Sequence, residues 1–326
     1  MLTRAADLWH HVSESNTHRR GERLNFEAAL VMKIVLRLLI AAWGLCVLLG
    51  AGAVGQQGPP PLATPQVPAQ ELVRRVIANE DKASKEHLRF LYRLRTETPK
   101  AGAITKELVE TNEGVVARLI AVNDKPPTSE ERQKDDERLQ KLASDPQART
   151  AKRKQQKEDE ERTTRMVKAL PDAFLYQYDG FEPGKSGQRL IRLKFKPNPK
   201  YDPPNRELQV YQGMEGSMLI DPSDERLVQI QARLFKGVNF GWGILGHLDP
   251  GGQFEVEQSR VGGDRWEVTN MRLRFTGKVL LFKILNINEN ETAFDYRRAP
   301  DNLSIVEGIE FLKKQPEFLA RKQGQQ

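Results

Sequence analysis

The sequence predicts a mainly β protein with some α-helix, organised around one large antiparallel sheet that curls into a full or partial barrel. Three observations support this fold class. About eleven segments alternate between apolar and polar residues, which is the pattern of strands with one buried face. Turn residues separate these segments at the spacing of hairpins, and no repeat of fixed period is evident.

The composition limits the packed core to part of the chain. Of the 326 residues, 38% are apolar and 29% are charged, and the mean hydropathy is −0.60. A long solvated stretch must therefore accompany the core. The net charge of +7 is mild for this length. Because the basic residues are not gathered in a patch interleaved with aromatics, we expect no nucleic-acid partner.

A removable signal peptide is expected at residues 32–55. Two basic residues precede an apolar run at 38–49 that is too short to span a bilayer comfortably, and small residues follow, as a signal peptidase requires. We expect cleavage near Gly55 and Gln56. The mature protein is then located in the periplasm or secreted.

The leader also sets the start of the chain and contains its one cysteine. Translation is expected to start at Met32, so residues 1–31 are interpreted as an extension from a misassigned start site. The alternative is a retained inner-membrane anchor through 34–49. Cys46 lies inside the leader, so the mature chain forms no disulfide. Leu45 precedes it, which argues against a lipid attached to this cysteine.

A proline-rich linker at 56–68 precedes the folded domain, which we expect over 69–315. The domain begins with a helix at about 69–87, because its apolar residues are spaced for one helical face. Three alternating runs follow and predict an antiparallel meander. These runs lie at 88–94, 104–108 and 115–121.

The segment 129–168 is dominated by charge and predicts two helices inserted into the sheet domain. Thr128 and Glu131 match a capping box, and Asp145 before Pro146 matches an N-cap followed by proline at the first helical position. Residues of opposite charge four positions apart add support. Because glutamates neutralise the one basic cluster within a turn or two, we interpret both helices as solvent-facing.

The second half returns to strands and ends in a helix. Residues 262–264 predict the tip of a hairpin between two alternating runs. Residues 279–287 are apolar at both odd and even positions, which predicts a strand buried on both faces. We expect a closing helix at 303–312 and a disordered tail at 316–326. The alternating runs lie at 174–178, 191–195, 228–234, 254–261, 266–275 and 292–296.

The sequence contains few residues suited to catalysis. Gly241 to Gly246 matches a dinucleotide-binding glycine pattern, but no segment able to open a helix follows it, so we reject a dinucleotide site. After leader removal only His87 and His247 remain, too few for a histidine metal site. We interpret His247 beside Asp249 as a turn residue rather than an acid–base pair. We therefore expect no enzyme activity, no metal and no cofactor.

An apolar loop after a strand is the candidate ligand-binding site. Its apolar residues are Phe240, Trp242, Ile244 and Leu245, and the glycines at 241 and 243 let the backbone bend around the indole. A loop this apolar must be buried, or it must contact an apolar ligand or partner. The sequence is compatible with two roles for this loop: it plugs the protein's own sheet, or it forms the rim where a ligand enters.

Two segments carry a family resemblance: Arg118 to Pro127 (RLIAVNDKPP) and Gly213 to Pro222 (GMEGSMLIDP). With the order of leader, helix, meander and charged helices, they resemble the periplasmic outer-membrane lipoprotein-sorting proteins (LolA/LolB-like), closest to uncharacterised acidobacterial-type relatives. The resemblance covers about 70–315. It implies a LolA-like half-barrel with lid helices, whose apolar concave face holds acyl chains. This chain departs from the family in its charged helices, and the family's lid-closing arginine matches no single position here.

Residues and resemblance together predict a non-enzymatic periplasmic binding or carrier protein that holds lipid or lipoprotein acyl chains. The expected partners are a lipid or lipidated protein and an envelope protein, and the chain is expected to be a monomer. The alternative is an envelope scaffold, with a sheet core filled by its own side chains and the charged helices at 129–168 as the partner surface.

Overall fold

A computed structural model describes residues 67–83, 88–240, 246–262, 265–279 and 283–316. The upstream extension, the signal peptide, Cys46 and most of the linker and tail lie outside these ranges, so the expectations for them stay predictions. Within the described ranges, no helix combines the length and apolar character needed to cross a membrane.

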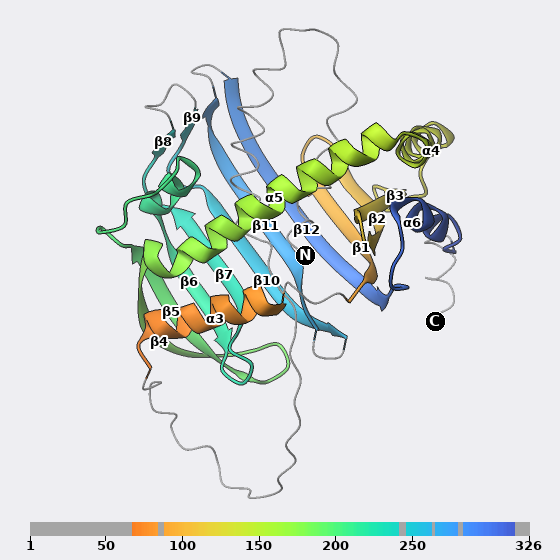
Figure 1. Cartoon of the computed structure of the whole chain (residues 1–326). Helices are drawn as coiled ribbons and strands as arrows, with labels where there is room; N and C mark the ends of the chain where they lie inside the picture. Colours follow the sequence, from red (N-terminus) through yellow and green to blue (C-terminus); the bar gives the residue numbers. More distant parts are fainter. Residues whose placement is uncertain (1–66, 84–87, 241–245, 263–264, 280–282, 317–326) are drawn as a thin grey trace, which may run out of the picture.

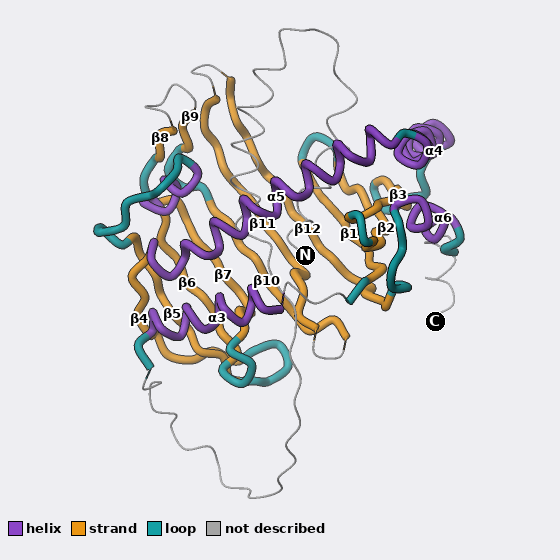
Figure 2. Tube along the Cα trace, in the orientation of Figure 1, coloured by secondary structure: helices purple, strands orange, loops and turns teal. Residues whose placement is uncertain are grey.

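The strands form one antiparallel sheet that does not close into a barrel (Figures 1 and 2). Its order is β3-β2-β1-β12-β11-β10-β7-β6-β5-β4, and the short pair β8–β9 joins it through β11. The fold class predicted from the alternating segments is confirmed by this open sheet. The strands are β1 Phe90–Thr98, β2 Gly102–Thr111, β3 Gly114–Val122, β4 Phe174–Pro183, β5 Arg189–Pro197, β6 Met214–Asp221, β7 Arg226–Leu234, β8 Val238–Phe240, β9 Gly246–Leu248, β10 Gln253–Gly262, β11 Arg265–Val279 and β12 Lys283–Arg298.

Local chemistry places the helix ends. Thr128 and Glu131 form the expected capping box, and the Asp145 side chain accepts from the amide of Gln147 with Pro146 at the first turn. Ser304 caps the closing helix in the same way. The helices are α3 Ala69–Ala83, α4 Ser129–Ser144, α5 Pro146–Ala173, the 3-10 helix η2 Glu207–Gly213, and α6 Ile305–Lys313.

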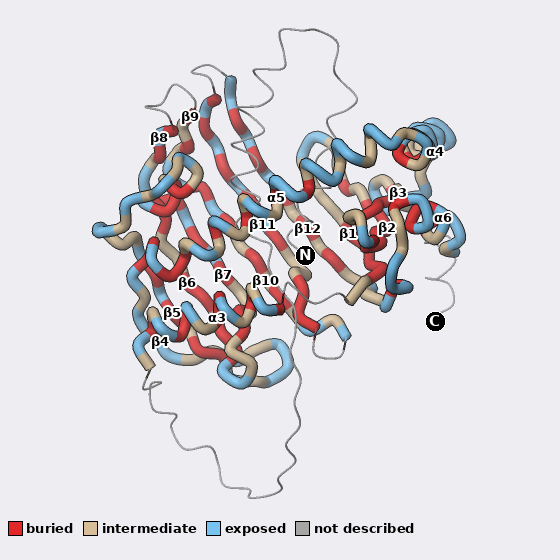
Figure 3. The backbone as a smooth tube through the Cα atoms, viewed as in Figure 1, coloured by how far each residue is buried: buried red, intermediate tan, exposed pale blue. Residues whose placement is uncertain are grey.

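Helices α3 and α5 cover one face of the sheet, and α5 crosses it diagonally (Figure 1). The main core lies between these helices and strands β4–β7 and β10–β12. Helix α3 contributes an apolar stripe that includes Leu72, Val76 and Ile77, as its periodicity predicts. Burial in Figure 3 follows the same alternation along the strands.

Strands β1–β3 carry apolar residues on both faces. Tyr92 and Leu108 belong to a cluster on the α5 side of the sheet. Leu91 and Val109 point to the opposite face, since successive residues of a strand alternate. On that opposite face helices α4 and α6 pack, so they lie outside the half-barrel whereas α5 lies over its inner side.

The charged segment differs from its prediction on one face. Gln156, Asp159 and Thr163 are buried in α5, so the prediction of a solvent-facing helix is wrong for this stripe. The reason is tertiary, because α5 passes over the tip of the β2–β3 hairpin, where Arg153 Nη1 lies 3.1 Å from Glu113 Oε1. The charged residues on the other faces of α4 and α5 remain exposed.

The predicted single strand at 279–287 is also wrong. Val279 at the end of β11 pairs with Lys283 at the start of β12, so the segment belongs to a hairpin. Ile284 is 79% exposed. The apolar residues of both parities therefore belong to two strands, and the hairpin predicted around 262–264 is confirmed by the pairing of β10 with β11.

Candidate functional site

The helix-covered face of the sheet is the candidate binding face, because alternate residues of seven strands make it continuously apolar. Representative side chains are Leu193, Met218, Ile230, Phe254 and Leu273. In the described ranges this face is packed against side chains of α3, α5 and η2. The apolar surface implied by the resemblance is therefore present, and the chain's own helices cover it.

Aromatic rings gather where α5 meets the edge of the sheet. The ring of Phe174 lies 4.8 Å from that of Phe195 and 5.1 Å from that of Tyr211, measured between centroids. The Tyr211 hydroxyl donates to the Met166 carbonyl at 3.0 Å, and Tyr176 donates to Leu170 at 2.8 Å. Burial raises the pKa of Tyr211 and Tyr176. Both hydroxyls therefore stay neutral; Tyr211 joins α5 to η2, and Tyr176 joins α5 to β4.

A buried ion pair fastens the C-terminal end of α3. Glu80 Oε2 lies 3.0 Å from Arg226 Nη2 on β7, and both side chains are at most 5% exposed. A second buried pair, Arg265 with Glu267 on β11, has its charges 2.8 Å apart. Burial raises the pKa of Glu80 against the opposing attraction of Arg226, and burial also lowers the pKa of Arg226.

The rim of the two helices is polar and solvent-accessible, in contrast to the apolar surface beneath them. Exposed and half-exposed ion pairs join α3 to neighbouring elements, and such pairs contribute little stability each. They are Arg74 with Asp172 at 3.0 Å, Arg75 with Glu225 at 3.1 Å, and Lys168 with Asp81 at 3.1 Å.

The predicted binding loop is described only at its start. Phe240 ends β8, is 7% exposed and belongs to the main core. Trp242, Ile244 and Leu245 lie outside the described residues. His247 on β9 lies beside the loop: its Nδ1 is 2.7 Å from Asn239 Oδ1, and its Nε2 is 3.4 Å from Asp249 Oδ1.

The His247–Asp249 contact therefore exists, but it occurs on a short edge ribbon with an asparagine as the other neighbour. No nucleophile is seen in these contacts. Across the described ranges, no group of three histidine, cysteine or acidic residues is placed to hold a metal ion.

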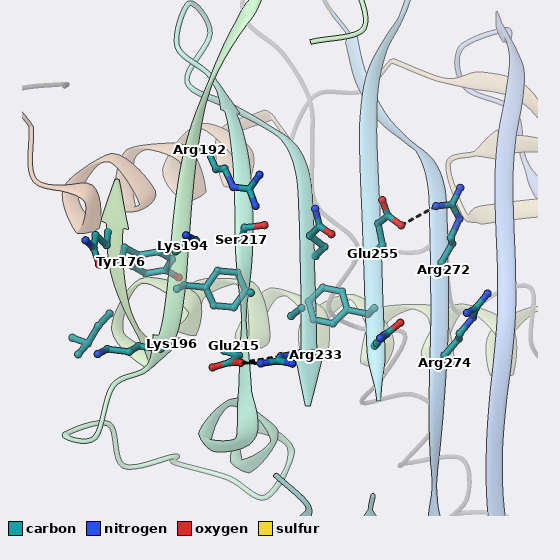
Figure 4. A pocket seen from close by; sticks show the side chains of 18 residues that line it. Tyr176, Arg192, Lys194, Lys196, Glu215, Ser217, Arg233, Glu255, Arg272 and Arg274 are labelled. Atoms are coloured by element: carbon teal, nitrogen blue, oxygen red, sulfur yellow. Dashed lines mark hydrogen bonds and ion pairs between the residues drawn. The ribbon is translucent and has the colours of Figure 1, made fainter. Parts of the chain in front are cut away.

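A groove of about 880 Å³ lies over β4–β7, β10 and β11 on the face of the sheet opposite α3 and α5. In Figure 4, Arg192, Lys194 and Lys196 follow one strand and Arg272 and Arg274 another. The sequence analysis missed this feature. The sequence does contain a pattern that indicates it: basic residues alternate with apolar ones in β5 and in β11, so the basic residues of each strand share one face. What the sequence did not show is that β5 and β11 flank one surface.

The sequence matches no family model, and no curated protein matches it at a significant level. Two solved structures are similar in fold. A DUF1329 family protein from Desulfovibrio piger is 11% identical, with 71% of this chain and 91% of that chain covered and a TM-score of 0.28. A LolA superfamily protein from Nitrosomonas europaea is 10% identical, with 72% and 94% covered and a TM-score of 0.27.

Proposed function

We propose that this protein is a non-enzymatic binding protein of the cell envelope that carries acyl chains of a lipid or lipidated protein between its sheet and helices α3 and α5. One observation carries the proposal: an open sheet has a continuous apolar face that helices cover, where a closed barrel or second sheet would seal it permanently. Lifting a helix would uncover a wide apolar surface.

Helix α3 is the element best suited to move. Only one of its faces is apolar, with Leu72, Val73 and Val76 almost fully buried. The ion pairs of Arg74 and Arg75 are exposed or half-exposed, and water can replace them, whereas the ion pair of Glu80 with Arg226 is buried. The helix can therefore open as a lid once this tie is broken.

The apolar loop after β8 is proposed as the entrance. Phe240 anchors its start in the core, which would leave Trp242, Ile244 and Leu245 as the side chains that meet an incoming chain. The leader supports an envelope location for the mature protein, acting as a monomer with a lipid or a lipidated envelope protein as its partner.

A second candidate is an envelope scaffold, and one observation favours it. In the described ranges the apolar face is already filled by the chain's own side chains. The exposed charged faces of α4 and α5 would then be the partner surface, and no lipid would enter.

The test is native mass spectrometry of the protein purified from its own envelope. A carrier should retain a lipid of defined mass, and the scaffold should not. In solution, Trp266→Phe leaves Trp242 as the one tryptophan of the mature chain, so a blue shift of its fluorescence with added lysophospholipid would report entry at the loop. The carrier function would be refuted if mass spectrometry detects no bound lipid and the fluorescence of Trp242 does not change with added lysophospholipid.

Variants at the rim of α3 and α5 distinguish opening of the lid from general destabilisation of the protein. Replacing Arg74, Arg75 and Lys168 together by alanine should speed exchange of a bound fluorescent fatty acid several-fold, because the lid loses its outer ties. The matched control is Lys185→Ala, which removes an ion pair with Glu257 that involves neither helix. Equal acceleration in the control would contradict a lid mechanism.

A further inference from the structure

The groove on the face opposite α3 and α5 has a regular construction that follows from strand register. Its floor is the backbone of one cross-strand row, Phe195–Gly216–Ala232–Phe254, whose side chains point to the other face. Polar rows on either side form its walls. The groove thus runs across the strands, and the two walls are roughly 7 Å apart because they are two residues apart along each strand.

Each wall carries a cation on β5 and a cation on β11, and beyond β5 it continues onto β4, with Gln177 beside Lys194 and Leu175 beside Lys196. One wall is Lys194–Ser217–Gln231–Glu255–Arg272, read directly from the strand pairs. In the other wall Glu215 pairs with Arg233, Arg233 with Gln253, and Gln253 with Arg274, and Lys196 follows at the β5 end. Two lysines therefore face each other at one end and two arginines at the other.

The middle of the groove is polar but locally neutral. Glu215 is 2.9 Å from Arg233, and Ser217, Gln231 and Gln253 supply hydroxyl and amide groups. The groove lining holds six basic and two acidic residues, a formal charge of +4. The excess is concentrated at the two ends.

One cation at each end has no carboxylate partner among the described contacts. At the β5 end Lys194 pairs with Asp179 at 2.7 Å, whereas Lys196 forms no ion pair. At the β11 end Arg272 pairs with Glu255 at 2.9 Å, whereas Arg274 forms none. The two unpaired cations are exposed and lie in the same wall, four strand spacings or roughly 19 Å apart.

We propose that this groove binds an elongated, hydroxyl-rich ligand that carries a phosphate at each end. Two cations meet at each end, which suits a phosphate with a charge near −2 better than a single carboxylate. The serine and glutamines between them suit hydroxyl groups, and the volume of about 880 Å³ is that of a small-molecule site. The site lies on the face opposite α3 and α5, so it goes beyond the carrier function and does not depend on it.

The proposal is tested by calorimetric titration of linear sugar-alcohol bisphosphates of increasing length, phosphorylated at both ends, with the matching monophosphates as reference. Affinity should pass through an optimum at the length that bridges Lys196 and Arg274, where the bisphosphate binds at least tenfold more tightly than the monophosphate. Lys196→Gln and Arg274→Gln should each reduce the bisphosphate to the monophosphate level. Equal affinity of both ligands at every length would overturn the proposal.

The matched control is Lys278→Gln, an exposed lysine on β11 that shares the face of Arg274 but lies outside the groove. This variant should bind as the wild type does, and a loss equal to that of Arg274→Gln would indicate general charge attraction and overturn the site. Competition by single-stranded DNA that is as strong as competition by the best bisphosphate would likewise indicate general charge attraction and overturn the site.

A second arm identifies the source of the phosphate. Capture of phosphatidylcholine vesicles containing phosphatidic acid, abolished by Lys196→Gln, would place it on a lipid headgroup. Bisphosphate binding without vesicle capture would place it on a soluble ligand, and binding of neither refutes the proposal. Failure of acyl-chain binding in the tests above leaves all these results unchanged, because they report the other face.

Discussion

The buried pair between Glu80 and Arg226 should be the strongest single attachment of helix α3. Arg226→Met removes the guanidinium and leaves a carboxylate that is fully buried at the foot of the helix. Breaking a buried pair from one side costs about 3–5 kcal/mol, because the remaining charge stays desolvated. Replacing both residues, as in Glu80→Leu with Arg226→Met, removes both charges and should restore most of that loss.

Urea unfolding of the wild type, both single variants and the double variant gives the coupling free energy of the pair. The expected coupling is several kcal/mol, with the double variant closer to wild type than Arg226→Met. If Arg226→Met loses less than about 1 kcal/mol, or if the losses simply add, the pair does not hold α3 in place, and breaking it would not release the helix as a lid.

The pH dependence of the same pair has a definite sign. Because burial raises the pKa of Glu80 above its ordinary 4.5, the folded protein keeps a proton on Glu80 that the unfolded chain has already released. The stability due to this group is full below that ordinary value and declines as the pH rises through the folded pKa. Glu80→Gln removes the titration, so the free energy of unfolding of the variant relative to wild type should increase with pH. A decrease would mean that attraction to Arg226 outweighs desolvation.

Three further changes test other parts of the fold by urea unfolding. Trp266→Ala should lose about 3–5 kcal/mol, since the ring is 4% exposed and its Nε1 donates to Asp224 at 3.2 Å; Trp266→Phe should lose much less. Met166→Ala in α5 should lose about 2–5 kcal/mol while Lys157→Ala stays within about 0.5 kcal/mol, and equal losses would contradict one-sided burial of α5. Gly216→Ala should be severely destabilising, because a Cβ would lie 2.0 Å from the Gln231 carbonyl oxygen; a neutral result would contradict the close strand approach at the groove floor.

Features determined by neighbours in sequence were predictable. The capping box at Thr128, the N-cap at Asp145 and the hairpin between β10 and β11 all depend on residues a few positions apart. The alternating runs also gave the inner and outer positions of most strands. The segment 279–287 was misread because the end of β11 and the start of β12 were taken as one strand.

Features determined by distant contacts were not predictable. Gln156 and Asp159 look like surface residues, and they are buried because α5 crosses the hairpin tip, where Gly114 lies against the Gln156 amide. The groove depends on β10 pairing with β7, past the β8–β9 ribbon, which no local pattern indicates. Alternation predicted the direction of Lys196 and Arg274, but only strand order relates them to one surface.

The sheet separates the two proposed activities because adjacent residues face opposite sides. Phe195 points into the core beneath α5, and Lys196, the next residue, points into the groove. A ligand in the groove and an acyl chain beneath the lid therefore share a backbone without sharing side chains. The backbone of the Phe195–Gly216–Ala232–Phe254 row is both the floor of the groove and the base of these core side chains. Because Gly216 has no side chain, the neighbouring strands approach closely in this row, where a Cβ would lie 2.0 Å from the Gln231 carbonyl oxygen.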